Sequence, residues 1–236
     1  MHQAPEIPEK LFEQYFASLI LENRENCIAL IDQWLQCDPS LQRLYEELFQ
    51  RSLYQIGALW EQGILTVTGE HHATALTESL MVHVYLRTIP SEPKNHCALA
   101  ACTPGESHRI GCRMVADFFE LHHWQCQFLG GNATVKQIKQ VITDQHIGLL
   151  ALSVTLPEHL KQLYKTVQSI RLSFPELPIL VGGQGFRNAD LTPFRSLTDV
   201  HYLKSLKSLE LWLQNYSPSI GPLTSRKAME EASLYN

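Results

Sequence analysis

The sequence predicts an α/β protein in which a four-helix bundle is followed by a doubly wound domain with a five-stranded parallel sheet. Residues 7–89 place apolar side chains at helical spacing and lack the alternation of a strand. Over residues 95–217, short and nearly continuous apolar runs alternate with helical segments, which is typical of parallel strands covered on both faces. Between them, Pro90-Ser91-Glu92-Pro93 predicts a stiff linker.

The first region contains four amphipathic segments. The first two have apolar faces over residues 11–20 and 27–35. A third helix is expected to begin with Asp38 as N-cap and Pro39 in its first turn, and Gly63 follows its end. The fourth is expected to begin near Thr66 and to run to residue 86. Four such segments with short connections predict a helical bundle.

The second region contains five strand–helix units. We expect strands at residues 97–102, 125–129, 148–154, 179–181 and 200–203, and helices at 110–122, 134–145, 158–173, 186–190 and 205–215. This order is typical of a flavodoxin-like (Rossmann-like) domain, in which the loops after strands one, three and four meet at the ligand-binding edge. The stretch 218–236 is polar without a clear period, so we expect a frayed or partner-bound tail.

Composition narrows the class of protein. The formal net charge of −5 over 236 residues argues against binding to a nucleic-acid backbone. No apolar run approaches the roughly 20 residues that span a bilayer, and the first residues lack the pattern of a signal peptide. The six cysteines form no C-x-x-C pair. Reduced thiols in a cytoplasmic protein are therefore expected.

The loop after the first predicted strand carries a carboxylate and an imidazole two residues apart. Glu106, His108 and Gly111 form the pattern E-x-H-x-x-G. An imidazole that binds a metal usually has its second nitrogen held by a carboxylate or carbonyl group, so Glu106 and His108 are a candidate pair. Taken alone, the pattern recurs by chance. The alternative is a helix-capping glutamate beside a surface histidine.

Two further segments follow at defined spacings. Ser153-Val154-Thr155 follows Gly111 after 41 intervening residues, and Gly182-Gly183 follows Thr155 after 26 more. Together the three pieces resemble the cobalamin-binding fingerprint D-x-H-x-x-G…S-x-L…G-G of the methionine synthase and methylmalonyl-CoA mutase class, over residues 95–217. Glu106 stands where that class has Asp, and Thr155 stands where it has Leu.

The resemblance implies that His108 is the lower axial ligand of cobalt and replaces the cofactor's own base. It implies that the nucleotide tail enters a slot lined by the second and third pieces. The residues expected to contact the cofactor in this domain are Glu106, Ser107, Arg109, Ile110, Gly111, Ser153, Val154, Thr155, Gly182 and Gly183.

The helical region carries a second resemblance. Trp60, Glu70 and His71 form W-x9-E-H, which resembles the signature of cobalamin-dependent photoreceptors of the light-regulated MerR-type repressor family. The resemblance implies that Trp60 packs over an adenosyl group, that Glu70 binds the adenosine, that His71 lies in the same pocket, and that the bundle caps the upper face of the corrin. The alternative is a core tryptophan and a solvated first helical turn.

The sequence departs from that family in two respects. Glu61 replaces the histidine that takes cobalt after photolysis, so the upper ligand is left open, with His71 and His72 as further donors. No helix-turn-helix segment precedes the bundle, which favours signalling to a partner protein over binding DNA. Some relatives without a DNA-binding domain also carry a bilin such as biliverdin, although no residue here indicates one.

We therefore expect a non-catalytic light sensor that binds adenosylcobalamin and forms a homo-oligomer in the dark. Two alternatives stay open, namely a corrinoid carrier for a methyltransferase and a cofactor-free interaction module.

Two further motifs were considered for binding sites. His122-His123-x-x-Cys126 lacks a fourth zinc ligand, so a helix end followed by a strand explains it better. Gly130-Gly131-Asn132 lacks a phosphate-binding pattern and predicts a turn.

Overall fold

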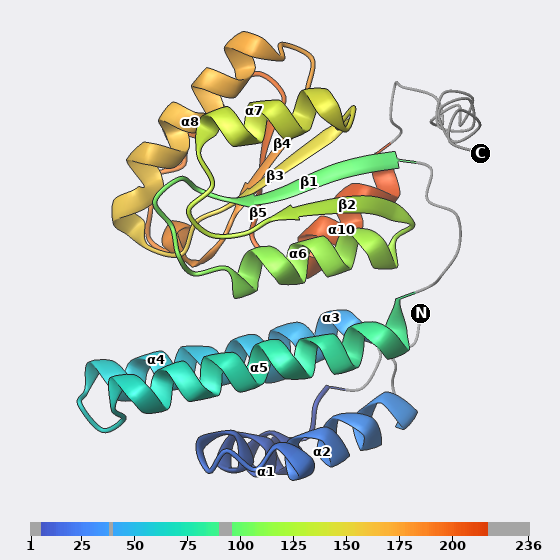
Figure 1. The fold of residues 1–236 in the computed structure, drawn as a ribbon, viewed down its shortest axis with the longest axis vertical. Helices are drawn as coiled ribbons and strands as arrows, with labels where there is room; N and C mark the ends of the chain where they lie inside the picture. The colour runs from blue at the N-terminus through green and yellow to red at the C-terminus, as the bar shows by residue number, and fades with distance from the viewer. Residues whose placement is uncertain (1–5, 38–39, 90–95, 217–236) are drawn as a thin grey trace, which may run out of the picture. The chain divides into compact units, whose positions relative to one another are not determined.

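The computed structural model describes residues 6–37, 40–89 and 96–216. Contacts divide the chain into two compact units, residues 1–89 and 90–236 (Figure 1). Each unit has its own hydrophobic interior. The two units are described separately.

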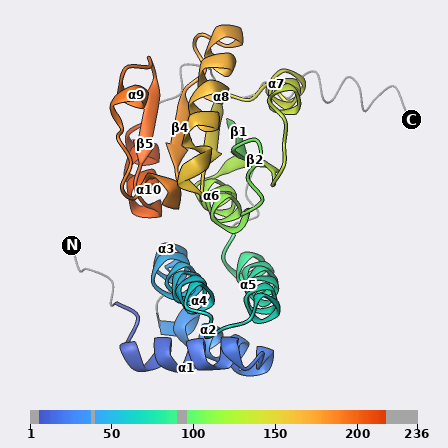
Figure 2. The same cartoon turned by 90° about the vertical axis from the view of Figure 1, so that its left-hand side faces the viewer.

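The N-terminal unit is helical. It contains α1 (Glu9–Ile20), α2 (Arg24–Cys37), a continuous helix made of α3 (Leu41–Arg43), η1 (Leu44–Gln50) and α4 (Arg51–Glu61), and finally α5 (Val67–Thr88). Helix α5 packs against α1, α2 and α4, and Figure 2 shows α4 and α5 nearly end-on. The interior is closed by large side chains that include Tyr15, Ile31, Tyr45, Phe49 and Leu80. The predicted helical bundle is therefore present.

Helix starts in this unit follow from capping side chains. Ser40 caps α3, and its hydroxyl accepts a hydrogen bond from the backbone N–H of Arg43 at 3.4 Å. The predicted cap, Asp38 with Pro39, lies outside the described residues. Helix α5 begins next to Thr66, as predicted, and the structure shows Thr66 as its cap, because the hydroxyl accepts a hydrogen bond from the N–H of Gly69 at 3.1 Å.

One stretch of the long helix departs from α geometry. Residues Leu44–Gln50 form wider i→i+5 turns. Leu44, Leu48, Ser52 and Ile56 follow one another at four-residue spacing, and all four are buried. A regular α-helix would rotate such a series steadily away from the core, since its period is about 3.6 residues. The wider turn offsets this drift and keeps the series on one face.

The C-terminal unit contains a five-stranded sheet. The strands are β1 (His96–Cys102), β2 (Trp124–Leu129), β3 (Leu149–Ser153), β4 (Ile179–Gly182) and β5 (Val200–Leu203). They are parallel throughout, in the order β2-β1-β3-β4-β5. Helices α7 (Val135–Asp144) and α8 (Leu160–Ser173) cover one face, and α6 (Ile110–Leu121) and α10 (Leu206–Asn215) cover the other (Figure 1). The predicted flavodoxin-like fold is confirmed.

The segment after β4 differs from the prediction. A helix was expected over residues 186–190, but the chain forms a 3-10 turn, η3 (Gln184–Phe186), followed by the short helix α9 (Thr192–Arg195). The Asp190 carboxylate accepts a hydrogen bond from the N–H of Thr192 at 2.9 Å, and Pro193 lies in the first turn of α9. These groups start the helix later. Likewise, η2 (Pro157–His159) precedes α8, which begins at Leu160 and not at residue 158.

Over the part of the chain that the structure describes, no helix is long and apolar enough to cross a membrane.

Candidate functional site

The sheet register brings the three pieces of the sequence pattern together. Cys102 of β1 pairs with Ser153 of β3, and Ser153 pairs with Gly182 of β4. Thr103 is buried, and its backbone N–H and its hydroxyl both donate to the carbonyl oxygen of Ser153, at 2.8 and 2.9 Å. The loops after β1, β3 and β4 therefore leave the sheet side by side at its carboxyl edge, where open α/β folds bind ligands.

Glu106 is the central side chain of this edge and is fully buried. Its Oε1 accepts hydrogen bonds from Nδ1 of His108 at 2.5 Å and from the backbone N–H of the same residue at 3.1 Å. Its Oε2 accepts from the backbone N–H groups of Thr155 at 3.0 Å and Leu156 at 3.1 Å. One carboxylate therefore joins the loop after β1 to the loop after β3.

The charge state of Glu106 follows from these contacts. Burial by itself would raise the pKa of the carboxyl group, but the hydrogen bonds from His108, Leu156 and His159 outweigh this effect and hold the pKa well below its usual range. Glu106 is therefore an ionised carboxylate, which accepts hydrogen bonds and donates none.

His108 combines a fixed ring with an accessible surface. Because Glu106 only accepts, Nδ1 of His108 carries the proton, and the lone pair of the neutral ring lies on Nε2. The His108 side chain is 52% exposed, whereas its carboxylate partner is buried. A carboxylate-held imidazole of this kind is the usual arrangement of a metal-binding histidine, so the donor set fits a cobalt ion ligated from this edge.

The structure adds a second imidazole that the sequence analysis missed. Nδ1 of His159 lies 3.1 Å from Oε2 of Glu106, so the two histidines share one carboxylate. His159 ends the 3-10 turn η2, which Pro157 begins directly after the loop that contacts Glu106. Glu106 and His159 lie 53 residues apart in the sequence, and no short motif connects them.

The glycines of the pattern serve two different purposes. A β-carbon on Gly111 would meet a single atom within 4 Å, Oγ of Ser153 at 3.9 Å, so the space beside Gly111 is open. At Gly182, however, it would lie 2.8 Å from the carbonyl oxygen of Leu203, and at Gly183, where φ is +116°, 2.2 Å from that of Val154. Gly182 and Gly183 are therefore required by contacts within the protein, whatever else approaches them.

The loop after β2 supports the same edge. A β-carbon on Gly131 would lie 3.0 Å from the carbonyl oxygen of Glu106, and the N–H of Asn132 donates to that oxygen at 3.0 Å. Asn132 has a φ of +63°, a conformation that asparagine tolerates better than most residues. Gly131 and Asn132 form the predicted turn, and this turn holds the backbone of the E-x-H loop.

The remaining predicted cofactor residues of this unit differ in accessibility. Ser107 and Arg109 are exposed, and Ile110, Ser153 and Thr155 are half-buried. Val154 is fully buried in the core of the unit, and its N–H and carbonyl group are hydrogen-bonded to Gly182 and Gly185. Its side chain therefore contributes to packing inside the fold.

The predicted residues of the helical unit lie on both sides of the turn between α4 and α5. Trp60 is 46% exposed, and Ile64 and Val67 beside it in sequence are exposed too, so the alternative of a core tryptophan is wrong. Oε1 of Glu70 accepts from the hydroxyl of Thr74 at 2.9 Å, and Nε2 of His71 lies 3.5 Å from Oε2 of Glu70.

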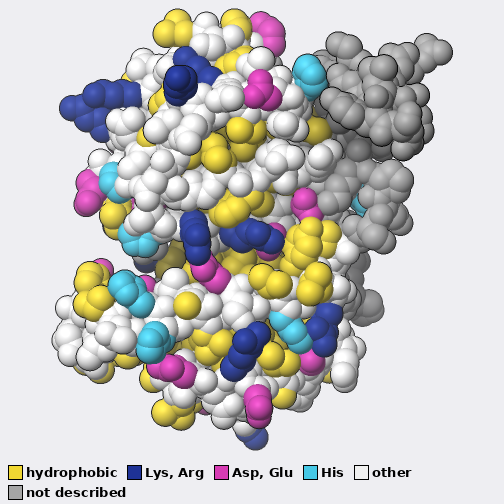
Figure 3. Space-filling view, in the orientation of Figure 1, with side chains coloured by type: hydrophobic (Ala, Val, Ile, Leu, Met, Phe, Trp, Pro, Cys, Tyr) yellow, Lys and Arg dark blue, Asp and Glu magenta, His cyan; other side chains and the backbone are white. Residues whose placement is uncertain are grey.

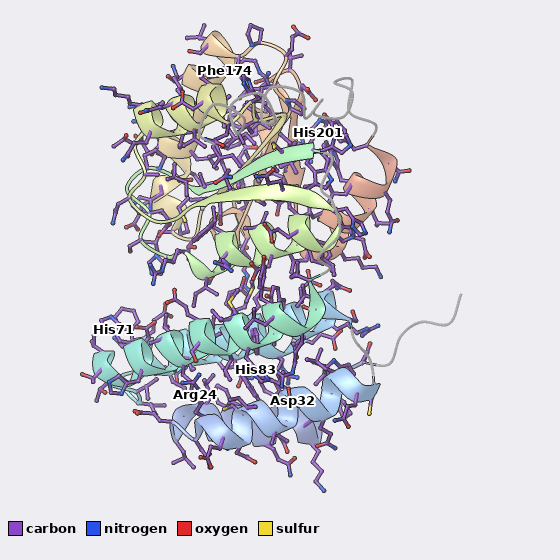
Figure 4. The ribbon with its side chains drawn as sticks, turned by 45° about the vertical axis from the view of Figure 1, so that its right-hand side comes forward. Arg24, Asp32, His71, His83, Phe174 and His201 are labelled. Atoms are coloured by element: carbon purple, nitrogen blue, oxygen red, sulfur yellow. The ribbon has the colours of Figure 1, made fainter. Side chains whose placement is uncertain are left out.

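This end of the helical unit exposes both apolar and histidine side chains. In Figure 3, hydrophobic and histidine side chains lie at the surface at the left-hand end of the unit, and Figure 4 labels His71 near the start of α5. Single exposed apolar side chains are normal on a protein surface, whereas a group of them marks a candidate contact site for a partner or a ligand.

Comparisons with known proteins define the class. Residues 97–194 match a B12 binding domain, and residues 11–85 match a second B12 binding domain model. Each of the two units therefore contains one of these matches. The chain therefore contains a two-part B12-binding module. That module is similar to part of the HTH-type transcriptional repressor CarH of Myxococcus xanthus, with 25% identity over 162 residues, covering 67% of this chain and 52% of the repressor. The chain thus spans about half the length of this curated relative.

A solved structure has the same fold. The monomethylamine corrinoid protein of Methanosarcina barkeri superposes with a TM-score of 0.73 at 12% identity, covering 88% of this chain and 99% of that one. At this identity the similarity shows the fold alone, and this neighbour is a corrinoid protein.

Proposed function

We propose that this chain is a cytoplasmic, non-catalytic light sensor that binds adenosylcobalamin base-off, with Nε2 of His108 as the lower axial ligand of cobalt. The observation that carries the proposal is the accessible imidazole of His108 on the buried carboxylate of Glu106. The open space beside Gly111 supports the approach of a large planar group. Similarity to the repressor CarH supports a regulatory role.

When bound, adenosylcobalamin supplies a weak cobalt–carbon bond that visible light can break. In this proposal Trp60 packs against the adenosyl group, Glu70 hydrogen-bonds the adenosine, and His71 lies in the same upper pocket. The exposure of Trp60 and its apolar neighbours supports this role, since such a surface lacks a packing partner within the helical unit.

Signalling then follows from packing. Trp60 would lose its partner when the adenosyl group departs, and an apolar void of that size costs about 3 kcal/mol. That energy is sufficient to favour a rearranged helical unit or a different oligomeric state, which a downstream protein partner would detect. We also propose that the chain forms a homo-oligomer in the dark and that a bilin binds beside the corrin.

The test is reconstitution with adenosylcobalamin in darkness, followed by absorption spectra and size-exclusion chromatography before and after green light. The proposal expects an imidazole-ligated spectrum in the dark, and a change in both spectrum and elution volume on illumination. Methylcobalamin, which has a light-sensitive cobalt–carbon bond but no adenosyl group, is the matched control ligand for the change in elution volume. An unchanged spectrum together with unchanged assembly contradicts light sensing.

A corrinoid carrier for a methyltransferase is the second candidate. Glu61 favours it, because the photoreceptors that the chain resembles use a histidine at this position. If the chain is a corrinoid carrier, its cargo is methylcobalamin, and Trp60 and Glu70 are not required for its function. Methyl transfer by a partner enzyme at equal rates with wild-type protein and with Trp60→Ala would favour the carrier.

A further inference from the structure

The buried carboxylate of Glu106 is shared by more donors than a single ligand pair needs. His108 supplies two N–H groups to Oε1. Oε2 receives two backbone N–H groups and Nδ1 of His159. Each donor on Oε2 withdraws part of the negative charge that would otherwise strengthen the bond between Oε1 and His108.

We propose that His159 is a positioning residue that acts on His108 through Glu106 and weakens the donor strength of the proposed cobalt ligand. This inference rests on the proposed function for its cobalt chemistry, but the coupling between the two imidazoles belongs to the protein alone. The contact at 3.1 Å places both rings on opposite oxygens of one buried group. A change at either end therefore alters the charge available to the other.

The local chain geometry directs His159 toward this contact. Pro157 begins the 3-10 turn η2, and the N–H of His159 donates to the carbonyl oxygen of Leu156 at 3.0 Å. The same loop contributes the backbone N–H groups that hold Oε2. The His159 side chain is 25% exposed, so its contact with the fully buried Glu106 is partly shielded from water.

The length of the Glu106 side chain matters for this arrangement. Glu106 reaches from the loop after β1 to the loop after β3, and both of its oxygens are used. An aspartate would be shorter by one methylene group, about 1.5 Å. Glu106→Asp is therefore expected to keep one loop and lose the other, so that His159 no longer influences His108.

The experiment compares three variants. His159→Leu removes the N–H donor, and His159→Asn retains an N–H donor close to the Nδ1 position. His201→Leu is the matched control, because Nε2 of His201 lies 2.8 Å from Oδ1 of Asp199, a histidine–carboxylate pair at the opposite end of the strands. Each variant of the 236-residue chain is loaded with cobalamin, and the midpoint potential of the cobalt(II)/cobalt(I) couple and the absorption spectrum are recorded.

We expect His159→Leu to keep the imidazole-ligated spectrum and to shift the potential to more negative values, because a stronger lower donor stabilises cobalt(II). His159→Asn should return the potential toward the wild-type value, and His201→Leu should leave it unchanged. An unchanged potential in His159→Leu overturns the inference. So does a water-ligated spectrum in both His159 variants, since that result would assign His159 a purely structural role.

A second measurement separates this inference from the proposed function. In the cobalamin-free protein, the imidazole ¹⁵N chemical shifts of His108 report the Glu106 hydrogen bond directly. We expect them to move in His159→Leu and to recover in His159→Asn. If wild-type protein fails to show imidazole ligation while these shifts respond, the cobalt assignment is wrong and the coupling stands. If the shifts do not respond, the coupling itself is wrong.

Discussion

The carbonyl oxygen of Val154 lies 2.2 Å from the point where a β-carbon on Gly183 would be placed. Gly183 also has a φ of +116°, which disfavours any side chain. The loops after β3 and β4 therefore approach as closely as their backbones allow. By contrast, Gly111 beside His108 has open space around it and lies in the first turn of α6.

Gly183→Ala and Gly111→Ala are expected to act in opposite directions. Gly183→Ala should lower the free energy of unfolding by about 2 kcal/mol or more, because of strain and overlap. Gly111→Ala should raise it by about 0.5–1 kcal/mol, as alanine favours a helix over glycine. Urea denaturation of the cobalamin-free proteins measures both changes in the free energy of unfolding.

Gly111→Ala should nevertheless weaken cobalamin binding. Titration followed by absorbance measures the affinity, and an unaltered affinity contradicts a corrin at this position.

His108→Ala is expected to remove the lower ligand. The side chain is half exposed, so the free energy of unfolding should change by less than about 1 kcal/mol. Cobalamin affinity should fall about tenfold or more, and the spectrum should become base-on or water-ligated. Added imidazole should restore the ligated spectrum by entering the vacated space. Wild-type affinity and spectrum in the variant would refute the assignment.

The lowered pKa of Glu106 predicts the pH dependence of stability. A carboxyl group whose pKa is lower in the folded than in the unfolded protein stabilises the fold above the unfolded pKa, and this contribution is lost as the pH falls. Stability should therefore decline as the pH falls below about 4.5, the ordinary value for glutamate. Denaturant unfolding at a series of pH values measures this slope.

Glu106→Gln provides the comparison for that slope. It should be less stable near neutral pH by about 1–3 kcal/mol, because an amide NH₂ group replaces one acceptor oxygen among N–H donors. It should also lose part of the acid-induced decline. Glu9→Gln is the surface comparison: pairing with Arg51 also lowers the pKa of Glu9, but this carboxylate is exposed, so its substitution should change the acid slope less than Glu106→Gln does. Equal acid slopes for wild type and Glu106→Gln would show that Glu106 is not the responsible group.

Two tryptophans of the helical unit should respond differently to truncation. Trp34 is 4% exposed, so Trp34→Ala should destabilise the fold by about 3–5 kcal/mol. Trp60 is 46% exposed, so Trp60→Ala should cost less than about 1 kcal/mol while reducing the preference for adenosylcobalamin over methylcobalamin. Thermal unfolding and competitive binding separate the two effects. If Trp60→Ala leaves the preference for adenosylcobalamin over methylcobalamin unaltered, Trp60 does not contact the adenosyl group.

Local patterns in the sequence were sufficient for the sheet and most helices. The apolar run at residues 97–102 lies within β1, and α5 begins at Val67, next to Thr66 where the fourth helix was expected to start. The helix expected at residues 186–190 was wrong, because the Asp190 carboxylate and Pro193 start a short helix, α9, only at Thr192. Asp190 and Pro193 were the residues in the sequence that indicated where this helix begins.

The candidate site was only partly accessible to sequence reasoning. Glu106 and His108 are two residues apart, so their pairing followed from local spacing. His159 reaches Glu106 because parallel strands bring the ends of β1 and β3 together, a contact that depends on tertiary structure. Pro157, which starts a helical turn just beyond Ser153-Val154-Thr155, was the one local hint that a side chain there faces the site.

The wide turns at Leu44–Gln50 have a consequence for the far end of the same helix. An i→i+5 turn holds one residue more than an α turn, so deleting a single residue in this stretch would restore regular geometry without breaking the helix. Such a deletion leaves the segment beyond it in nearly its present direction. If the same residues instead formed regular α turns, everything beyond them would rotate by about 100° around the helix axis relative to the preceding segment. Trp60 would no longer point in its present direction, although no residue near it had changed. The angular setting of that indole ring is therefore encoded more than two helical turns upstream.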